Sequence, residues 1–242
     1  MNRAKWGATL VCLVALGFIA RVLLGPRPHV NAEHVREIAT RGLAGYLAQT
    51  QPGRRVLVFS NPFASEANTE PAIVKMEEAG IRGLQEGWKG KLNMVAIALP
   101  ELKAGARGNP GAFITDPETT TPLSYLVAPG AFDNQAKLHP GCDLVVSLIG
   151  LPADLDRCEI WTRSGPPTFA LLLPDLAVIG GTEAVRQAVK SGKLIAFILR
   201  RPGAPSDSEP VTSDSLAEFQ KRFVLVTQDN FEEVLKSNPE LQ

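Results

Sequence analysis

Seven residues that could shape a ligand site stand directly after the apolar runs of this sequence. They are Ser60, Asn61, Glu101, Gly150, Pro152, Asp175 and Asp229. In open α/β sheets, ligands bind outside the carboxyl ends of the strands, so these residues predict a rim that binds a small polar ligand or a partner loop. Turn residues also stand at such places for a simpler reason, since a chain that leaves a strand must turn. The rim is therefore a hypothesis about binding and points to no reaction.

No catalytic constellation accompanies this rim. The sequence has no glycine-rich dinucleotide fingerprint, no P-loop and no G-x-S-x-G nucleophile elbow. His29, His34 and His139 are not spaced as metal ligands. We therefore predict no catalytic residue, no metal and no cofactor, and favour a protein that is not an enzyme. An enzyme would have to use the rim residues Ser60, Asn61, Asp175 and Asp229.

Cys142 and Cys158 flank a predicted strand and the turn after it. A strand of about eight residues separates its ends by roughly 25 Å. The two sulfur atoms reach bonding distance only if residues 151–158 return sharply. A disulfide between Cys142 and Cys158 is thus one alternative, and two buried free thiols are the favoured one.

Composition limits the class of partner. Lys+Arg 25 balance Asp+Glu 25 in 242 residues, so the chain lacks the basic excess that nucleic-acid binding usually needs. A hydrophobic content of 45% is enough for a packed core. The length fits one large α/β domain or two small ones.

The first residues carry a membrane signal. Residues 6–25 contain the uncharged run 6–20, and as a helix they are roughly 30 Å long, which is enough to cross a bilayer. A cleaved secretory signal is the alternative. Basic residues flank both sides of the run, so they leave the orientation open. We favour a retained single-pass anchor with an exported, periplasmic-side domain.

The remaining sequence divides into three predicted parts. Residues 1–30 form the anchor or signal segment, residues 31–53 an amphipathic juxtamembrane helix, and residues 54–242 a single α/β domain. The helix has apolar residues at three- and four-residue spacing, which suits packing on the following domain, on a membrane or on a partner helix.

Alternating apolar strands and helices predict the fold class. Strands are expected at 56–60, 92–99, 143–150, 168–173, 193–199 and 222–227. Apolar strands with helices between them predict a three-layer, doubly wound α/β fold with a mostly parallel sheet of about six strands. We expect the first strand to be central. The long irregular segment 100–121 should lie over or beside the carboxyl edge of the sheet.

Three segments resemble one lobe of the type I periplasmic binding proteins, namely 131–152, 194–202 and 223–227. They are also similar to membrane-anchored bacterial proteins of unknown function that contain such a lobe. The resemblance covers about half of the chain and implies a Rossmann-like α/β fold. The family uses two lobes with a hinge, and residues 54–242 give room for one. No ligand residues of the family can be carried over.

Three functions remain in competition. The anchor, the amphipathic helix and the missing catalytic residues favour a membrane-tethered accessory or scaffold subunit that contacts a larger assembly. The resemblance favours a ligand-binding or sensing module instead. An enzyme of unknown reaction is the third alternative.

Overall fold

Six apolar segments pair into one sheet in the computed structural model, which describes residues 28–238. The strands are β1 (Arg55–Phe59), β2 (Asn93–Ala98), β3 (Leu144–Ser147), β4 (Thr168–Leu172), β5 (Leu194–Arg200) and β6 (Phe223–Thr227). All six lie within the predicted ranges or extend one residue beyond them. Every residue of β3 is buried, as expected for a strand that is covered on both faces.

The sheet has the strand order β2-β1-β3-β4-β5-β6. β1 to β5 are parallel, and β6 pairs antiparallel with β5. The predicted six-stranded, mostly parallel sheet is thus confirmed. The expectation that the first strand is central is wrong, because only β2 lies outside β1 whereas four strands lie on its other side.

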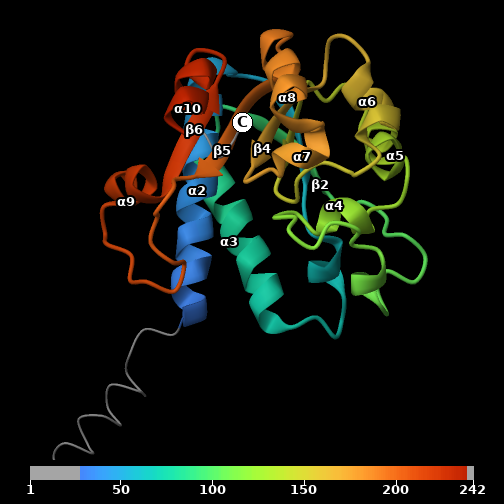
Figure 1. The fold of residues 1–242 in the computed structure, drawn as a ribbon, viewed down its shortest axis with the longest axis horizontal. Helices are drawn as coiled ribbons and strands as arrows, with labels where there is room; N and C mark the ends of the chain where they lie inside the picture. The colour runs from blue at the N-terminus through green and yellow to red at the C-terminus, as the bar shows by residue number, and fades with distance from the viewer. Residues whose placement is uncertain (1–27, 239–242) are drawn as a thin grey trace, which may run out of the picture.

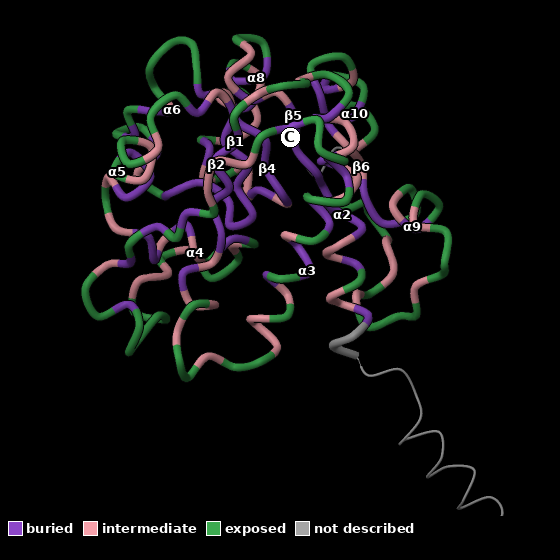
Figure 2. The backbone as a smooth tube through the Cα atoms, turned by 180° about the vertical axis from the view of Figure 1, so that it is seen from behind, coloured by how far each residue is buried: buried purple, intermediate pink, exposed green. Residues whose placement is uncertain are grey.

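Helices cover both faces of the sheet (Figures 1 and 2). The longer elements are α2 (Pro28–Thr50), α3 (Pro71–Trp88), α5 (Ala131–Leu138), α8 (Gly181–Lys190), α9 (Ser215–Arg222) and α10 (Phe231–Ser237). The short ones are η1 (Pro62–Ser65), η2 (Pro110–Ala112), α4 (Leu123–Leu126), η3 (Leu155–Arg157), α6 (Glu159–Thr162) and α7 (Leu176–Ile179). Val56 and Val58 of β1 pack with α2 and α3, whereas Leu57 and Phe59 pack with α5, α8 and α10. This alternation gives two cores, one on each face of the sheet.

The helix predicted after the membrane signal packs on the domain. Val35, Leu43 and Leu47 of α2 are buried in the same core as β1, β3 and α3. α3 approaches α2 closely because glycines face the crossing. A Cβ atom at Gly83 would lie 2.1 Å from the Thr40 Oγ1 and 2.3 Å from the Glu37 carbonyl oxygen. Only glycine permits this separation of the two helices.

The predicted membrane segment lies outside the described residues. Between residues 28 and 238 no helix is both long enough and apolar enough to span a bilayer. The expectations for residues 6–25, and for the anchor or signal segment 1–30, therefore stay predictions.

Candidate functional site

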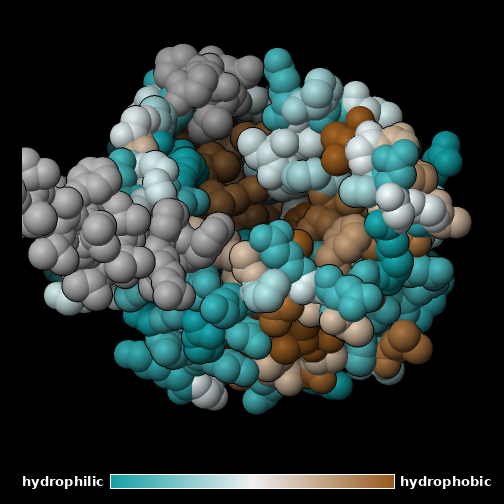
Figure 3. Space-filling view, turned by 90° about the horizontal axis from the view of Figure 1, so that it is seen from below, coloured by the Kyte–Doolittle hydropathy of each residue, from teal (hydrophilic) through white to brown (hydrophobic). Residues whose placement is uncertain are grey.

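β1 to β5 end at one edge of the sheet, because they are parallel. β2 lies on one side of β1 and β3 on the other, so the direction of strand addition reverses between β1 and β3. Ligands of open α/β sheets bind at such a reversal, outside the carboxyl ends. Figure 3 looks onto this side of the molecule and shows apolar residues at the bottom of a hollow surrounded by hydrophilic ones.

A cavity of about 460 Å³ lies at the reversal, and we call it the switch cavity. The start of α3, the residues after β1 and β3, and the segment 120–123 line it. Its apolar lining includes Leu148, Ile149 and Leu172. Polar groups reach the same space from Arg36, Asn61 and Glu77.

An ion pair joins two helices at this cavity. The Arg36 guanidinium of α2 donates to the Glu77 carboxylate of α3 at 2.5 Å and to the Leu148 carbonyl at 3.3 Å. The other carboxylate oxygen of Glu77 accepts from the Ser60 hydroxyl at 2.7 Å and from the Asn61 backbone N–H at 3.4 Å. Glu77 is therefore fixed by α2 and by the two residues that follow β1, which holds the polar wall of the cavity in place.

A second cavity, of about 610 Å³, adjoins the first one, and we call it the β4–β5 cavity. Thr120 and Leu173 line both cavities. The β4–β5 cavity also contains Asp175 after β4, Arg200 at the end of β5, and the first residues of α8. Asp175 accepts from the Thr119 hydroxyl at 2.5 Å and from the Ala177 backbone N–H at 3.0 Å.

The contact between Thr119 and Asp175 connects the irregular segment to the carboxyl edge. This confirms that the segment 100–121 lies over or beside that edge. Thr121 at its end is buried, and its side chain accepts a hydrogen bond from the Ser124 hydroxyl at 2.9 Å. The segment thus contributes a wall that both cavities share.

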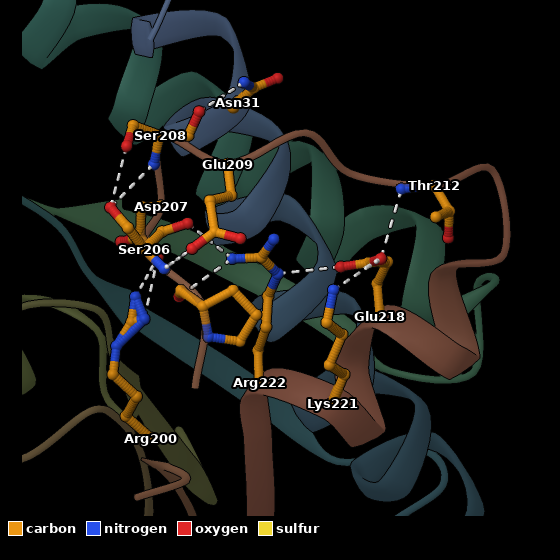
Figure 4. Close-up of polar contacts among 11 residues, drawn as sticks. Asn31, Arg200, Ser206, Asp207, Ser208, Glu209, Thr212, Glu218, Lys221 and Arg222 are labelled. Atoms are coloured by element: carbon orange, nitrogen blue, oxygen red, sulfur yellow. Dashed lines mark hydrogen bonds and ion pairs between the residues drawn. The ribbon is translucent and has the colours of Figure 1, made fainter. Parts of the chain in front are cut away.

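Arg200 is held from the other side by residues 201–214, which we call the strap. The Arg200 guanidinium pairs with Asp207 of the strap (Figure 4). The strap is anchored by Arg222, which is fully buried and donates to the Ser206 carbonyl at 2.9 Å and to Glu218 at 2.9 Å. The strap also reaches α2, because the Asn31 amide donates to the Ser208 carbonyl at 2.9 Å.

The structure brings three of the predicted rim residues to these cavities. Asn61 lines the switch cavity, Ser60 is buried behind it, and Asp175 lines the β4–β5 cavity. Ser60 and Asp175 use their side-chain oxygens to fix neighbouring groups. The Asn61 side chain accepts from the Phe63 backbone N–H and caps η1. Their predicted role in ligand binding stays a prediction.

The other four rim residues have different places. Gly150 follows β3 with a φ of +78°, and a Cβ there would lie 3.0 Å from Thr121. Pro152 is buried next to this turn, and Glu101 is exposed after β2. Asp229 follows β6, which is antiparallel, so it lies at the opposite edge of the sheet. Its expected position among the carboxyl ends is wrong, because the direction of an edge strand depends on its pairing.

Cys142 and Cys158 are free and buried, which is the alternative favoured from the sequence. Burial, with Asp133 close by, raises the pKa of the Cys158 thiol to about 12. Burial also raises the pKa of the Cys142 thiol. Within residues 28–238, no group of three or more His, Cys, Asp and Glu is placed to hold a metal ion.

Sequence reasoning missed three polar residues of the two cavities, namely Arg36, Glu77 and Thr120. Arg36 and Glu77 stand within α2 and α3, whose apolar spacing predicts packing and no site. A signal was available for both, since each is a charged residue next to apolar helix positions.

Comparisons with known proteins identify no family. No family model matches the chain, and no curated protein matches it. Solved structures with a similar arrangement include an arabinose-binding protein from Geobacillus stearothermophilus. It is 10% identical with a TM-score of 0.45, and the match covers 82% of this chain and 62% of that one.

A substrate-binding protein of a sugar ABC transport system from Bordetella parapertussis is 12% identical with a TM-score of 0.45, covering 81% of this chain and 57% of that one. A carbohydrate transporter solute-binding protein from Agrobacterium radiobacter, in complex with D-arabinose, is 15% identical with a TM-score of 0.42. The match covers 87% of this chain and 63% of that one. This chain thus spans less than two thirds of their length. The predicted resemblance to periplasmic binding proteins is confirmed as a resemblance of fold at low identity.

Proposed function

We propose that this protein is a ligand-binding or sensing module that holds a small, net-neutral polar molecule across the switch cavity and the β4–β5 cavity. The observation that carries the proposal is the pair of adjoining cavities at the carboxyl edge, of about 460 and 610 Å³. Ligand pockets have volumes of about 300–1,000 Å³.

Charge selects the class of ligand. Each cavity contains one basic and one acidic residue, Arg36 with Glu77 in the first and Arg200 with Asp175 in the second. Each of the four is already engaged with a protein group. Such a lining has no net charge to offer, so it suits hydroxyl, amide or zwitterionic groups that accept and donate hydrogen bonds.

Apolar side chains select the shape of the ligand. Leu148, Ile149, Leu172 and Leu173 line the switch cavity, and Leu173 continues into the β4–β5 cavity. A molecule with one apolar face and several polar groups at its edge, such as a cyclic polyol, would cover these side chains and still meet the polar walls.

A substitution at the shared wall tests the proposal. Thr120 is exposed and lines both cavities, so Thr120→Trp should fill them without disturbing the core. We would measure the Tm of the full chain in detergent against neutral monosaccharides, other polyols and zwitterionic amino acids. A Tm increase in the wild type that Thr120→Trp removes supports the proposal.

The matched control is Ser164→Trp, which places the same side chain at an exposed position of the opposite edge. This variant should keep the ligand response. The proposal is wrong if no compound of the panel raises the Tm, or if both tryptophan variants respond as the wild type does.

The membrane-tethered accessory or scaffold subunit, predicted first from the sequence, remains a separate prediction. Purification of the full chain from native membranes tests the accessory-subunit prediction. A stable stoichiometric complex would support that prediction, and a lone chain that binds a small molecule would contradict it. Extraction by detergent but not by high salt would support the single-pass anchor at residues 6–25. Protection from protease in cells whose outer envelope has been opened would contradict the exported, periplasmic-side domain.

A further inference from the structure

A third cavity, of about 780 Å³, lies at the amino-terminal edge of the sheet, opposite to the proposed ligand site. The turn after α6, the start of β4, the end of α8 and the residue before β5 surround it. Figure 1 shows this turn beside α8 at the top of the view. We call this space the amino-edge cavity.

The amino-edge cavity is lined by three cationic side chains, those of Arg54, Arg163 and Lys193. None of the residues that line it is an aspartate or a glutamate. This lining differs from those of the two cavities at the carboxyl edge, where each contains one arginine and one acidic residue. An apolar wall completes the cavity and includes Trp161 and Ile179.

Two of the cations are held in place by hydrogen bonds to the protein. The Lys193 ammonium donates to the carbonyl oxygens of Arg163 at 3.0 Å, Gly165 at 3.2 Å and Pro167 at 3.0 Å. The Arg54 guanidinium donates through Nη1 to the Thr168 hydroxyl at 3.1 Å and to the Asp143 carbonyl at 3.4 Å. Both positive groups are thus positioned before any ligand arrives, which reduces the entropy lost on binding.

Arg163 is the cation whose side-chain N–H donors are available to a ligand. Its side chain is exposed, and within residues 28–238 its guanidinium has no hydrogen-bond or ion-pair partner. Its charge acts on its neighbours, however. Burial and the Arg163 guanidinium together lower the pKa of Lys193 to about 8. With two guanidinium groups and no carboxylate in its lining, the cavity still holds positive charge that nothing in this lining neutralises.

We propose that the amino-edge cavity binds a small organic anion, with its carboxylate or phosphate oxygens on Arg163 and Arg54 and its apolar or aromatic part against Trp161. A guanidinium offers paired N–H donors that match the oxygens of either group. The indole ring of Trp161, which packs edge-on against Phe169, offers the ligand a flat apolar surface.

Four probes test this site on the full chain in detergent. Phenyl phosphate and benzoate combine an anion with a ring, inorganic phosphate is the anion alone, and benzyl alcohol is the ring alone. We expect phenyl phosphate or benzoate to raise the Tm at millimolar concentration more than inorganic phosphate, and benzyl alcohol to have no effect. The stronger of the two identifies the preferred anion.

Two variants assign the effect to this cavity. Arg163→Gln removes a charge that no fold contact uses and should weaken Kd for the preferred probe by about tenfold or more. Ser164→Trp should block the cavity. Lys137→Gln, at an exposed lysine of α5, and Thr120→Trp are the controls and should bind as the wild type does.

The site does not exist if neither ring-bearing anion raises the Tm, or if Arg163→Gln and Ser164→Trp bind the probe with unchanged Kd. Equal weakening by Arg163→Gln and Lys137→Gln would show general charge attraction instead, and would also overturn the proposal.

Discussion

Arg36 on α2 and Glu77 on α3 form an ion pair of 2.5 Å, which ties the two helices of one face to the carboxyl edge of the sheet. Both side chains are largely buried, with 16% and 10% of their surface exposed. Ser60 at the end of β1 donates to the same carboxylate. A single acidic residue thus connects the first strand with both helices beside it.

Glu77→Ala should lower the free energy of unfolding by about 2–4 kcal/mol, because it leaves a largely buried guanidinium and a buried hydroxyl without their acceptor. Urea unfolding measures the loss. Glu159→Ala is the control, since Glu159 is exposed and lies 3.9 Å from Lys137, and such surface pairs contribute little. Equal losses in the two variants would contradict the bridging role of Glu77.

Gly83→Ala should destabilise the protein, although alanine is normally the better helix residue by about 1 kcal/mol. The new Cβ would meet Thr40 and the Glu37 backbone, so α2 and α3 must separate. Gly45→Ala is the matched control on α2, because a Cβ there meets nothing within 4 Å. It should stabilise the protein, and thermal unfolding of both variants gives the comparison. A gain in Tm for Gly83→Ala would refute the close crossing.

Cys142 and Cys158 should resist N-ethylmaleimide in the folded protein at neutral pH. Thiolates are the reacting species, and burial raises the pKa of both thiols. Peptide mapping by mass spectrometry should find both labelled after denaturation without reductant. A disulfide-linked peptide joining them would contradict the structure and support the other alternative from the sequence.

Lys193 should give the protein a stability that increases with pH. Its pKa is about 8 in the folded chain against an ordinary value of 10.5, so the unfolded chain binds more protons between these two values. The free energy of unfolding therefore rises across that range through this residue. The difference between wild type and Lys193→Met, measured by urea unfolding at pH 7 to 10.5, isolates the effect. A difference that is constant with pH would contradict it.

The strands were predictable because each is an apolar run bounded by turn residues, and burial on both faces leaves such a run few alternatives. The direction of β6 was not, since nothing within Phe223–Thr227 states whether its neighbour runs parallel to it. Asp229 was misplaced for that reason alone. The position of the segment 100–121 was predictable because a loop begins where its strand ends.

The polar walls of the candidate site were harder to predict. Arg36 and Glu77 are 41 residues apart, and they meet only because glycines let α2 and α3 cross closely. The strap that holds Arg200 depends on Arg222, whose burial no local pattern indicates. Contacts between distant elements therefore determine the site, whereas local patterns determine the strands.

The direction of α2 has a consequence for how the domain is oriented. α2 begins at Pro28, and Arg36 at the switch cavity is eight residues later, about 12 Å along the helix axis. Whatever precedes Pro28 therefore joins the domain on the side of the two carboxyl-edge cavities, and the amino-edge cavity lies at the opposite edge of the sheet. A molecule bound at the start of α2 would then crowd the first site and leave the second one open.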